Sequence, residues 1–350
     1  MYFVRYILNI LYRVAYRSEG LKRLYRITKG IDNPQSKVLK YLTLPLKLTY
    51  CLLSNVPPVN GFFGYVKADN IKEPISLSRE EKVFFRIEKT APGLEIGPSH
   101  QPLAPKRAGF NVHVLDHLSA AELREKYKKK QVDTSQIEDV DFVWNGEPYS
   151  ELIGKSDCYS WIIASHVIEH TPDLLGFLRE CESLLSPDGV LSLVIPDRRY
   201  CFDHFVPETT TGAVLDAFFE KKKKRTPGQV FDHLAHASRN KGQVGWTVLD
   251  GPPDALAFEF SEVQKEVERC INSDEYIDGH TWRFTPKSFS NILFNLQGLS
   301  LISLTEDVSF STVGCEFYVT LRKSNTNSSP ILMSQSERLE RLFSVVSERT

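Results

Sequence analysis

Several features that would place this chain in a membrane or outside the cell are missing. No stretch of the 350 residues reaches the roughly 18 consecutive apolar residues that a spanning helix needs, and no secretory cleavage pattern is present. The cysteines are few and scattered, with no close pair: Cys51, Cys158, Cys181, Cys201, Cys270 and Cys315. Their spacing argues against a disulfide framework or a zinc site and predicts a cytoplasmic protein with reduced thiols.

An excess of charge of one sign is also missing. The chain has 43 Lys and Arg against 44 Asp and Glu, so its formal net charge is −1. Nothing in the overall charge favours nucleic acid, and we expect no nucleic-acid partner. The length can hold one large domain with extensions, or two domains.

The neutral total conceals a basic N-terminal segment. Residues 1–50 carry ten Lys and Arg against Glu19 and Asp32. Basic and polar positions recur every four residues in 1–27, opposite apolar ones, which predicts an amphipathic helix. Such a helix can lie on an anionic membrane surface or pack on the main domain. We therefore expect residues 1–75 to be a helical extension and linker, with peripheral association at the inner face of the membrane as one hypothesis.

From Gly93 onward the pattern alternates between strand and helix, which predicts an α/β fold with a mostly parallel sheet. Helices are expected after the cap residues Ser119, Thr171 and Thr285, the last two followed by proline. Pro187 to Gly189 indicates a tight turn. The expected strands cover residues 93–96, 112–116, 141–144, 158–164, 190–195, 299–305 and 316–322.

The rest of the chain divides around this pattern. We predict a main domain at 76–323, with a long insertion at about 198–284 that forms an acceptor-binding lid. The basic run Lys221 to Arg225 within it is interpreted as a solvated helix face. Residues 324–350 are expected to form a linker and an amphipathic helix (332–346) that docks in cis or pairs with another subunit, so an oligomer stays open.

The G-x-G-x-x-G fingerprint of dinucleotide-binding proteins is missing, because Pro98, Ser99 and His100 follow Gly97. Gly97 itself permits a sharp turn and the close approach of a ligand. Asp116 ends the second strand about twenty residues later, where a carboxylate can accept two hydrogen bonds from a ribose diol. Together, the turn and the carboxylate predict an adenosine-containing cofactor.

The order of elements and several motifs resemble those of class I S-adenosylmethionine-dependent methyltransferases. The segments that resemble the first two motifs of that family are LEIGPSHQP and VHVLDH. The segment that resembles its type-11-like group is ASHVIEHTPD followed by LLSPDGVLSLVIPD. Four segments resemble bacterial members associated with polysaccharide synthesis: PDRRYCFDHF, FDHLAHA, GHTWRFTP and EFYVTLRK. The resemblance covers roughly residues 93–323 and implies a Rossmann-like seven-stranded sheet. The chain departs from the family's glycine motif at Pro98 and His100, and Pro102 and Pro105 break the crossover.

The resemblance also implies which residues bind S-adenosylmethionine. Glu95 would accept from the donor's amino group, and Asp116 would accept from the ribose hydroxyls. Positions near the end of the fourth strand lie where the methyl group should point. The full set of expected cofactor residues is Glu95, Gly97, Pro98, Asp116, His117, Asn145, Gly146, Ser165 and His166.

A sugar hydroxyl needs a general base, and histidine is best matched to neutral pH. The candidate catalytic residues are His170, His204, His233 and Asp197. Asp203–His204 and Asp232–His233 are adjacent acid–histidine pairs that can orient such a base. Expected acceptor contacts come from Arg198 and Arg199, which suit a phosphate or a uronic acid, and from Tyr200, His236 and Trp282. Trp282 either stacks on a sugar ring or lies in the core, and His280 and Arg283 are expected beside it.

His166, Glu169 and His170 form H-x-x-E-H, in which the three side chains can share a helix face and hold a metal. Alternatively, Glu169 and His170 orient the loop after the fourth strand. We predict no metal and keep a divalent ion as the alternative.

The leading hypothesis is an S-adenosylmethionine-dependent O-methyltransferase that acts on a sugar of a surface polysaccharide or a lipid-linked glycan precursor. It would work by in-line methyl transfer with a histidine base. One alternative is a non-catalytic methyltransferase-like scaffold in a glycan-synthesis complex. Another is a methyltransferase for a quinone or other small-molecule hydroxyl.

Overall fold

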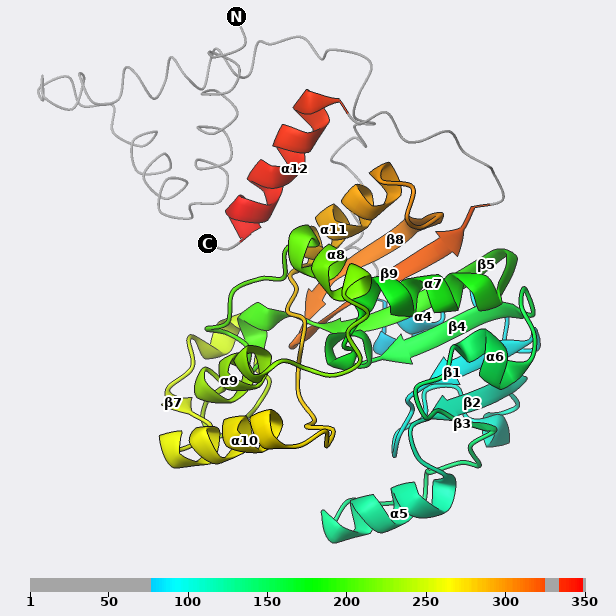
Figure 1. Ribbon diagram of the computed structural model, residues 1–350. Helices are drawn as coiled ribbons and strands as arrows, with labels where there is room; N and C mark the ends of the chain where they lie inside the picture. The colour runs from blue at the N-terminus through cyan, green and yellow to red at the C-terminus, as the bar shows by residue number, and fades with distance from the viewer. Residues whose placement is uncertain (1–76, 325–333, 349–350) are drawn as a thin grey trace, which may run out of the picture. The chain divides into compact units, whose positions relative to one another are not determined.

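The computed structural model describes residues 77–324 and 334–348, so the expected N-terminal helices and the linker at 325–333 lie outside the described residues. A seven-stranded sheet forms the centre of the fold, in the order β3-β2-β1-β4-β5-β9-β8 (Figure 1). The first five strands run parallel, and β9 is antiparallel to both of its neighbours. The mostly parallel, seven-stranded sheet expected from the sequence is therefore confirmed. The strands are β1 (Gly93–Ile96), β2 (Val112–Asp116), β3 (Phe142–Val143), β4 (Tyr159–Ser165), β5 (Leu185–Pro196), β8 (Leu304–Val313) and β9 (Glu316–Lys323).

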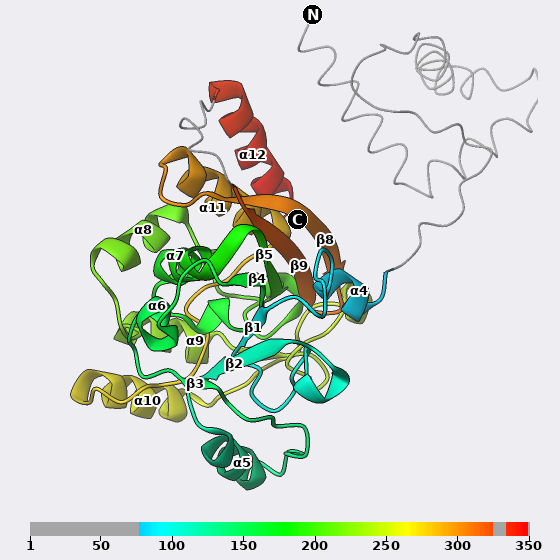
Figure 2. The same cartoon turned by 90° about the vertical axis from the view of Figure 1, so that its right-hand side faces the viewer.

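The central strands of the sheet are buried on both faces, and their successive side chains point to opposite sides of the sheet. In β4, Ile162 and Ala164 enter the larger hydrophobic core, whereas Trp161 and Ile163 enter a smaller one. Figure 2 shows helices on one side of the sheet and the short α4 (Arg79–Val83) on the other. The helices whose side chains join the larger core are α6 (Tyr149–Ile153), α7 (Leu174–Leu184), α8 (Thr211–Phe219) and α11 (Pro286–Gly298).

Two expected helix starts are confirmed by capping boxes. Ser119 caps α5 (Ala120–Lys129), and Thr285 caps α11 with Pro286 in its first turn. The expected cap of α7 is wrong. Asp173 is its N-cap, because the Asp173 carboxylate accepts the Gly176 N–H at 2.9 Å, whereas Thr171 ends a short 3₁₀ helix.

Two expectations about turns and strands need correction. The strand expected at 299–305 begins only at Leu304, because Leu299 and Ser300 close the end of α11 with N–H bonds to Asn295 and Gln297. The turn at Pro187 to Gly189 lies inside β5 as an irregularity. Asp188 has a φ of 63° there, and the register of β4 and β5 shifts.

The connection from β1 to β2 has only a short 3₁₀ helix (Lys106–Ala108), as expected for a crossover broken by prolines. The region expected to be a lid is composite. Its α8 belongs to the larger core, whereas α9 (Pro227–Ala235) and α10 (Phe260–Asn272) share a small core of their own.

The expected C-terminal helix is α12 (Gln335–Glu348), which buries Val345 and places Arg341 over the Phe294 ring of α11 at 3.8 Å. Its remaining large apolar side chains are exposed: Leu339, Leu342, Phe343 and Val346. Among the described residues, no helix has both the length and the apolar character needed to cross a membrane.

Candidate active site

The carboxyl ends of β2, β1 and β4 meet at one edge of the sheet. The register pairs Ile96 of β1 with Leu115 of β2 and with Ala164 of β4. Gly97 and Asp116 therefore lie at one edge, together with the residues after Ala164. Ligands of open α/β sheets bind at this edge. The residues predicted to bind S-adenosylmethionine therefore lie where a ligand is expected.

The loop after Gly97 is fastened to Asp116. Gly97 has a φ of 62°, and a Cβ at this position would lie 3.0 Å from a methyl carbon of Val167. Both constraints favour glycine. The buried carboxylate of Asp116 accepts the N–H groups of Ser99 at 3.0 Å and His117 at 2.7 Å. These bonds fix the carboxylate at the rim and leave it lone pairs for a further donor.

Glu95 of β1 holds the connection between β1 and β2 by accepting two hydrogen bonds from it. Its buried carboxylate accepts the N–H groups of Leu103 at 2.7 Å and Ala104 at 3.0 Å. Burial raises the pKa of Glu95 to about 7, although these two bonds act in the opposite direction. Contact with the amino group of the donor stays a prediction for this residue.

The other predicted cofactor residues lie at the same rim, on loops except for Ser165, which ends β4. Asn145 and Gly146 form the turn after β3, where Gly146 has a φ of 102° and the Asn145 N–H bonds to Glu147 at 2.8 Å. The His117 ring is half-exposed, with Nδ1 2.6 Å from an oxygen of Asp116. Pro98 follows Gly97 directly.

His166 follows β4 in a left-handed conformation, with a φ of 54°. Its Nε2 lies 2.9 Å from Oε2 of Glu316 on β9, and its Nδ1 lies 3.5 Å from Oε1 of Glu169. Burial lowers the pKa of His166, but the two carboxylates outweigh burial and raise the pKa to about 9. The ring is therefore an imidazolium at neutral pH, which has no lone pair for a metal or a proton.

His170 is paired with a carboxylate from the end of the insertion. Its Nδ1 lies 3.0 Å from Oδ1 of Asp278. Burial lowers the pKa of His170, but the bond to Asp278 and the charge of Glu169 raise it above its ordinary value overall. In return, the bond from His170 holds the pKa of Asp278 well below its usual range. The result is an oriented acid–histidine pair beside the end of β4.

The acid–histidine pairs expected from adjacent residues are wrong. Asp203 is buried and bonds instead to Nδ1 of His280 and, at 3.1 Å, to Nε of Arg283. His204 turns its Nδ1 to the backbone carbonyl of Arg199 at 2.8 Å. Neighbours on a short loop point in different directions, so sequence adjacency did not bring these side chains together.

The second expected pair fails in the same way. Asp232 lies 3.8 Å from Nδ1 of His236, one helical turn away. His233 accepts the N–H of His280 through its Nδ1 at 3.4 Å. Burial and the nearby charge of His280 lower the pKa of His233 to about 3. Its ring has little affinity for a proton at neutral pH.

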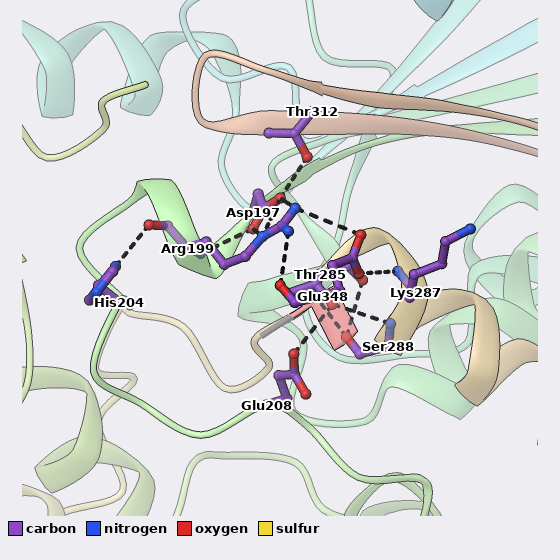
Figure 3. Close-up of polar contacts among 9 residues, drawn as sticks. All are labelled: Asp197, Arg199, His204, Glu208, Thr285, Lys287, Ser288, Thr312 and Glu348. Atoms are coloured by element: carbon purple, nitrogen blue, oxygen red, sulfur yellow. Dashed lines mark hydrogen bonds and ion pairs between the residues drawn. The ribbon is translucent and has the colours of Figure 1, made fainter. Parts of the chain in front are cut away.

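Asp197 and Arg199 form a structural clamp (Figure 3). Asp197 is fully buried and accepts from Nε of Arg199 at 2.9 Å, from Nη2 at 2.5 Å and from the Thr312 hydroxyl at 2.6 Å. Arg199 also donates to the backbone carbonyl of Glu348 at 3.2 Å, and the Glu348 carboxylate accepts the N–H of Lys287 at 2.8 Å. The cluster therefore joins the ends of β5, β8, α11 and α12.

The other predicted acceptor residues are largely engaged within the protein. Arg198 donates to the carbonyls of Val206 at 2.7 Å and His204 at 2.5 Å. Trp282 is 2% exposed, lies in the larger core and donates its indole N–H to Thr171, which favours the core interpretation over stacking. Tyr200 lies under the Arg199 guanidinium at 5.2 Å.

Glu169, His170 and His280 bring one ligand atom each within 4.8 Å of one another, a group that could hold a divalent metal. The fully buried Glu169 carboxylate has no hydrogen-bond partner among the described residues, and Asp203 orients His280 as carboxylates orient metal-binding histidines. The group shares two members with the predicted trio, and His280 replaces His166. A metal stays the alternative hypothesis.

Sequence reasoning missed Asp278, Glu316 and Arg225. Asp278 pairs with His170, which lies far away in the sequence, so no local spacing pointed to this pair. Glu316 contacts His166 across 150 positions, so no local pattern could have revealed the pair. Arg225 ends the basic run interpreted as solvent-exposed, yet it is only 6% exposed.

The chain was compared with known proteins and solved structures. None of the curated proteins shows significant sequence similarity to the chain. Solved structures with a similar fold include the CurJ carbon methyltransferase (13% identity, TM-score 0.33), with 68% of this chain covering 49% of that one. Two more are the 1,6-didemethyltoxoflavin-N1-methyltransferase of Burkholderia thailandensis with bound S-adenosylhomocysteine (12%, TM-score 0.34, 70% and 76% covered) and SAM-dependent methyltransferases from Methanosarcina mazei (12%, TM-score 0.33, 68% and 94% covered).

The aligned part spans about half of the first of these structures. The sequence itself carries the assignment, because residues 76–303, well over half of the chain, match the methyltransferase domain family. The chain therefore belongs to the methyltransferase domain family of S-adenosylmethionine-dependent enzymes.

Proposed function

We propose that this methyltransferase transfers the methyl group of S-adenosylmethionine to a hydroxyl of a sugar, with His170 as the general base. The observation that carries the proposal is the ion pair of 3.0 Å between His170 and Asp278 beside the end of β4. A histidine that is oriented by a carboxylate, and whose pKa the same carboxylate raises, suits the removal of a hydroxyl proton.

The proposed reaction is an in-line displacement. Asp278 accepts the Nδ1–H of His170, which leaves a lone pair on Nε2. That lone pair takes the acceptor's hydroxyl proton while the oxygen–methyl bond forms and the sulfur–methyl bond breaks. The products are the methyl ether, S-adenosylhomocysteine and an imidazolium. The negative charges of Asp278 and the buried Glu169 stabilise that imidazolium.

The sugar acceptor rests on the resemblance of four segments to polysaccharide-associated bacterial methyltransferases. We expect cells that lack the protein to lose a methyl group, about 14 mass units or one CH₂, from a surface glycan. Mass spectrometry of the glycans measures this loss, and re-expression of the wild-type chain is the control. Identical glycan masses with and without the protein would contradict the sugar assignment.

Membrane association is the second part of the proposal. The basic, amphipathic residues 1–27 would hold the enzyme near a lipid-linked acceptor. We expect the full chain to sediment with vesicles of anionic lipid and a chain without residues 1–60 to stay in the supernatant. Equal behaviour of the two chains would remove the membrane role.

The other two hypotheses have less support. A non-catalytic scaffold does not need the family's donor motif, whereas Asp116 is present and buried at the rim. A quinone or other small phenol would suit an apolar acceptor wall. The residues near His170 include instead Asp278, Glu169 and Arg225, which favour a polar acceptor.

A further inference from the structure

The side chain of Arg225 is a buried charge. Its residue is 6% exposed, and none of its three guanidinium nitrogens has a hydrogen-bond partner among the described residues. Arg198 and Arg199, the arginines expected to contact the acceptor, already bond to carbonyls and to Asp197. Arg225 thus differs from these two arginines, because none of its guanidinium nitrogens donates to a described residue.

The guanidinium lies against the segment that also orients the proposed base. A Cβ built on Gly279 would lie 2.2 Å from Nη1 of Arg225 and 2.6 Å from Nε2 of His233, so both groups touch this glycine. Asp278, the partner of His170, directly precedes it. The positive charge of Arg225 also acts on His170, whose pKa it lowers. Arg225 therefore belongs to the acceptor side of the site.

No described residue neutralises the charge of Arg225 through a hydrogen bond. Burial lowers the pKa of Arg225, and the nearby Tyr276 and Asp278 only partly offset this effect. Asp278 is already paired with His170. A buried guanidinium without a hydrogen-bonded counter-ion is among the most unfavourable arrangements in a folded protein, so a bound anion would relieve it.

We propose that Arg225 binds an oxyanion of the acceptor, the carboxylate of a uronic acid or the phosphate of a sugar phosphate. The planar guanidinium matches either group with two parallel N–H bonds. The proposal rests on the proposed function, because it assumes that the acceptor enters beside His170. It narrows the acceptor from any sugar to an anionic one.

The test measures oxyanion binding to the full chain saturated with S-adenosylhomocysteine. The probes are glucuronate, glucose 1-phosphate and neutral glucose at constant ionic strength, followed by calorimetry. We expect saturable binding of at least one oxyanion, tenfold or more tighter than that of glucose. Glucuronate alone would identify the source as a carboxylate, and glucose 1-phosphate alone as a phosphate. No binding of either oxyanion to the wild-type chain would overturn the proposal.

Variants locate the bound oxyanion. Arg225→Met should lose at least tenfold in oxyanion affinity, and Arg225→Lys should fall between it and the wild type. The matched control is Arg269→Met, because Arg269 is an exposed arginine of α10 paired with Glu266 at 2.8 Å. This control should bind like the wild type. Equal affinity of Arg225→Met and the wild type would overturn the proposal.

The stability of the ligand-free protein gives a second readout. Removal of an unpaired buried charge should keep or raise the melting temperature, whereas a structural arginine would lower it clearly in Arg225→Met. A clear fall would overturn the proposal. The glycan experiment stays separate: unchanged glycan masses together with Arg225-dependent oxyanion binding would refute the sugar assignment and leave the oxyanion site standing.

Discussion

Replacement of Asp116 by alanine is expected to lower the affinity for S-adenosylmethionine about a hundredfold. The buried carboxylate is proposed to accept both ribose hydroxyls, and hydrogen bonds to charged groups contribute about 1.5–3 kcal/mol each. The loss of two such bonds costs about 3 kcal/mol, and about 1.4 kcal/mol corresponds to a factor of ten. The alanine also removes the acceptor for the Ser99 N–H that holds the loop after Gly97. Calorimetric titration of the purified chain measures the effect.

Two further variants separate the contact with the cofactor from a loss of folding. Asp116→Asn keeps the shape and one acceptor oxygen, so we expect an intermediate loss of affinity. Asp141 is the matched control, because its carboxylate also accepts a backbone N–H, that of Val114 at 2.7 Å. Asp141 precedes β3, whereas Asp116 stands at the carboxyl end of β2. Asp141→Ala should bind S-adenosylmethionine like the wild type. Wild-type affinity in Asp116→Ala would remove this carboxylate from the donor site.

The sheet could be predicted because its determinants are local. Strands that are buried on both faces read as continuous apolar runs, as in residues 158–164, and parallel strands bring their carboxyl ends to one edge whatever their order. Gly97 and Asp116 therefore fell at the same rim once the strands were identified. Helix starts at Ser119 and Thr285 were equally local, since a capping box spans four residues.

The charged groups could not be predicted in the same way. The side chain of His166 contacts Glu316, which is 150 positions away, and that of Asp203 contacts His280, which is 77 positions away. Their proximity depends on β9 lying beside β5 and on the way the insertion returns to the sheet. Adjacent letters such as Asp203 and His204 carry no information about these distances. The position of Arg225 shows the same limit, because a basic run looks alike whether its last member is exposed or buried.

A second large effect is expected at His170. His170→Ala should lower turnover by about 10² to 10⁴, the usual contribution of a general base, while the affinity for S-adenosylmethionine stays unchanged. Turnover is the transfer of labelled methyl to glycan extracted from cells that lack the protein. His204→Ala is the comparison, because the Nδ1 of His204 contacts only a backbone carbonyl within the insertion. Full activity of His170→Ala would exclude His170 as the base.

The pH profile distinguishes a base from a residue that merely supports the loop. The neutral form of His170 is active, so kcat/KM should rise with pH through a pKa above the ordinary value near 6.5. Asp278 and Glu169 raise that pKa, and Arg225 lowers it. Asp278→Asn should therefore move the rising limb to lower pH, and Arg225→Met should move it to higher pH. A structural role for His170 predicts no shift in either variant. Opposite shifts from two neighbours of opposite charge require that the group which titrates lies near both of them.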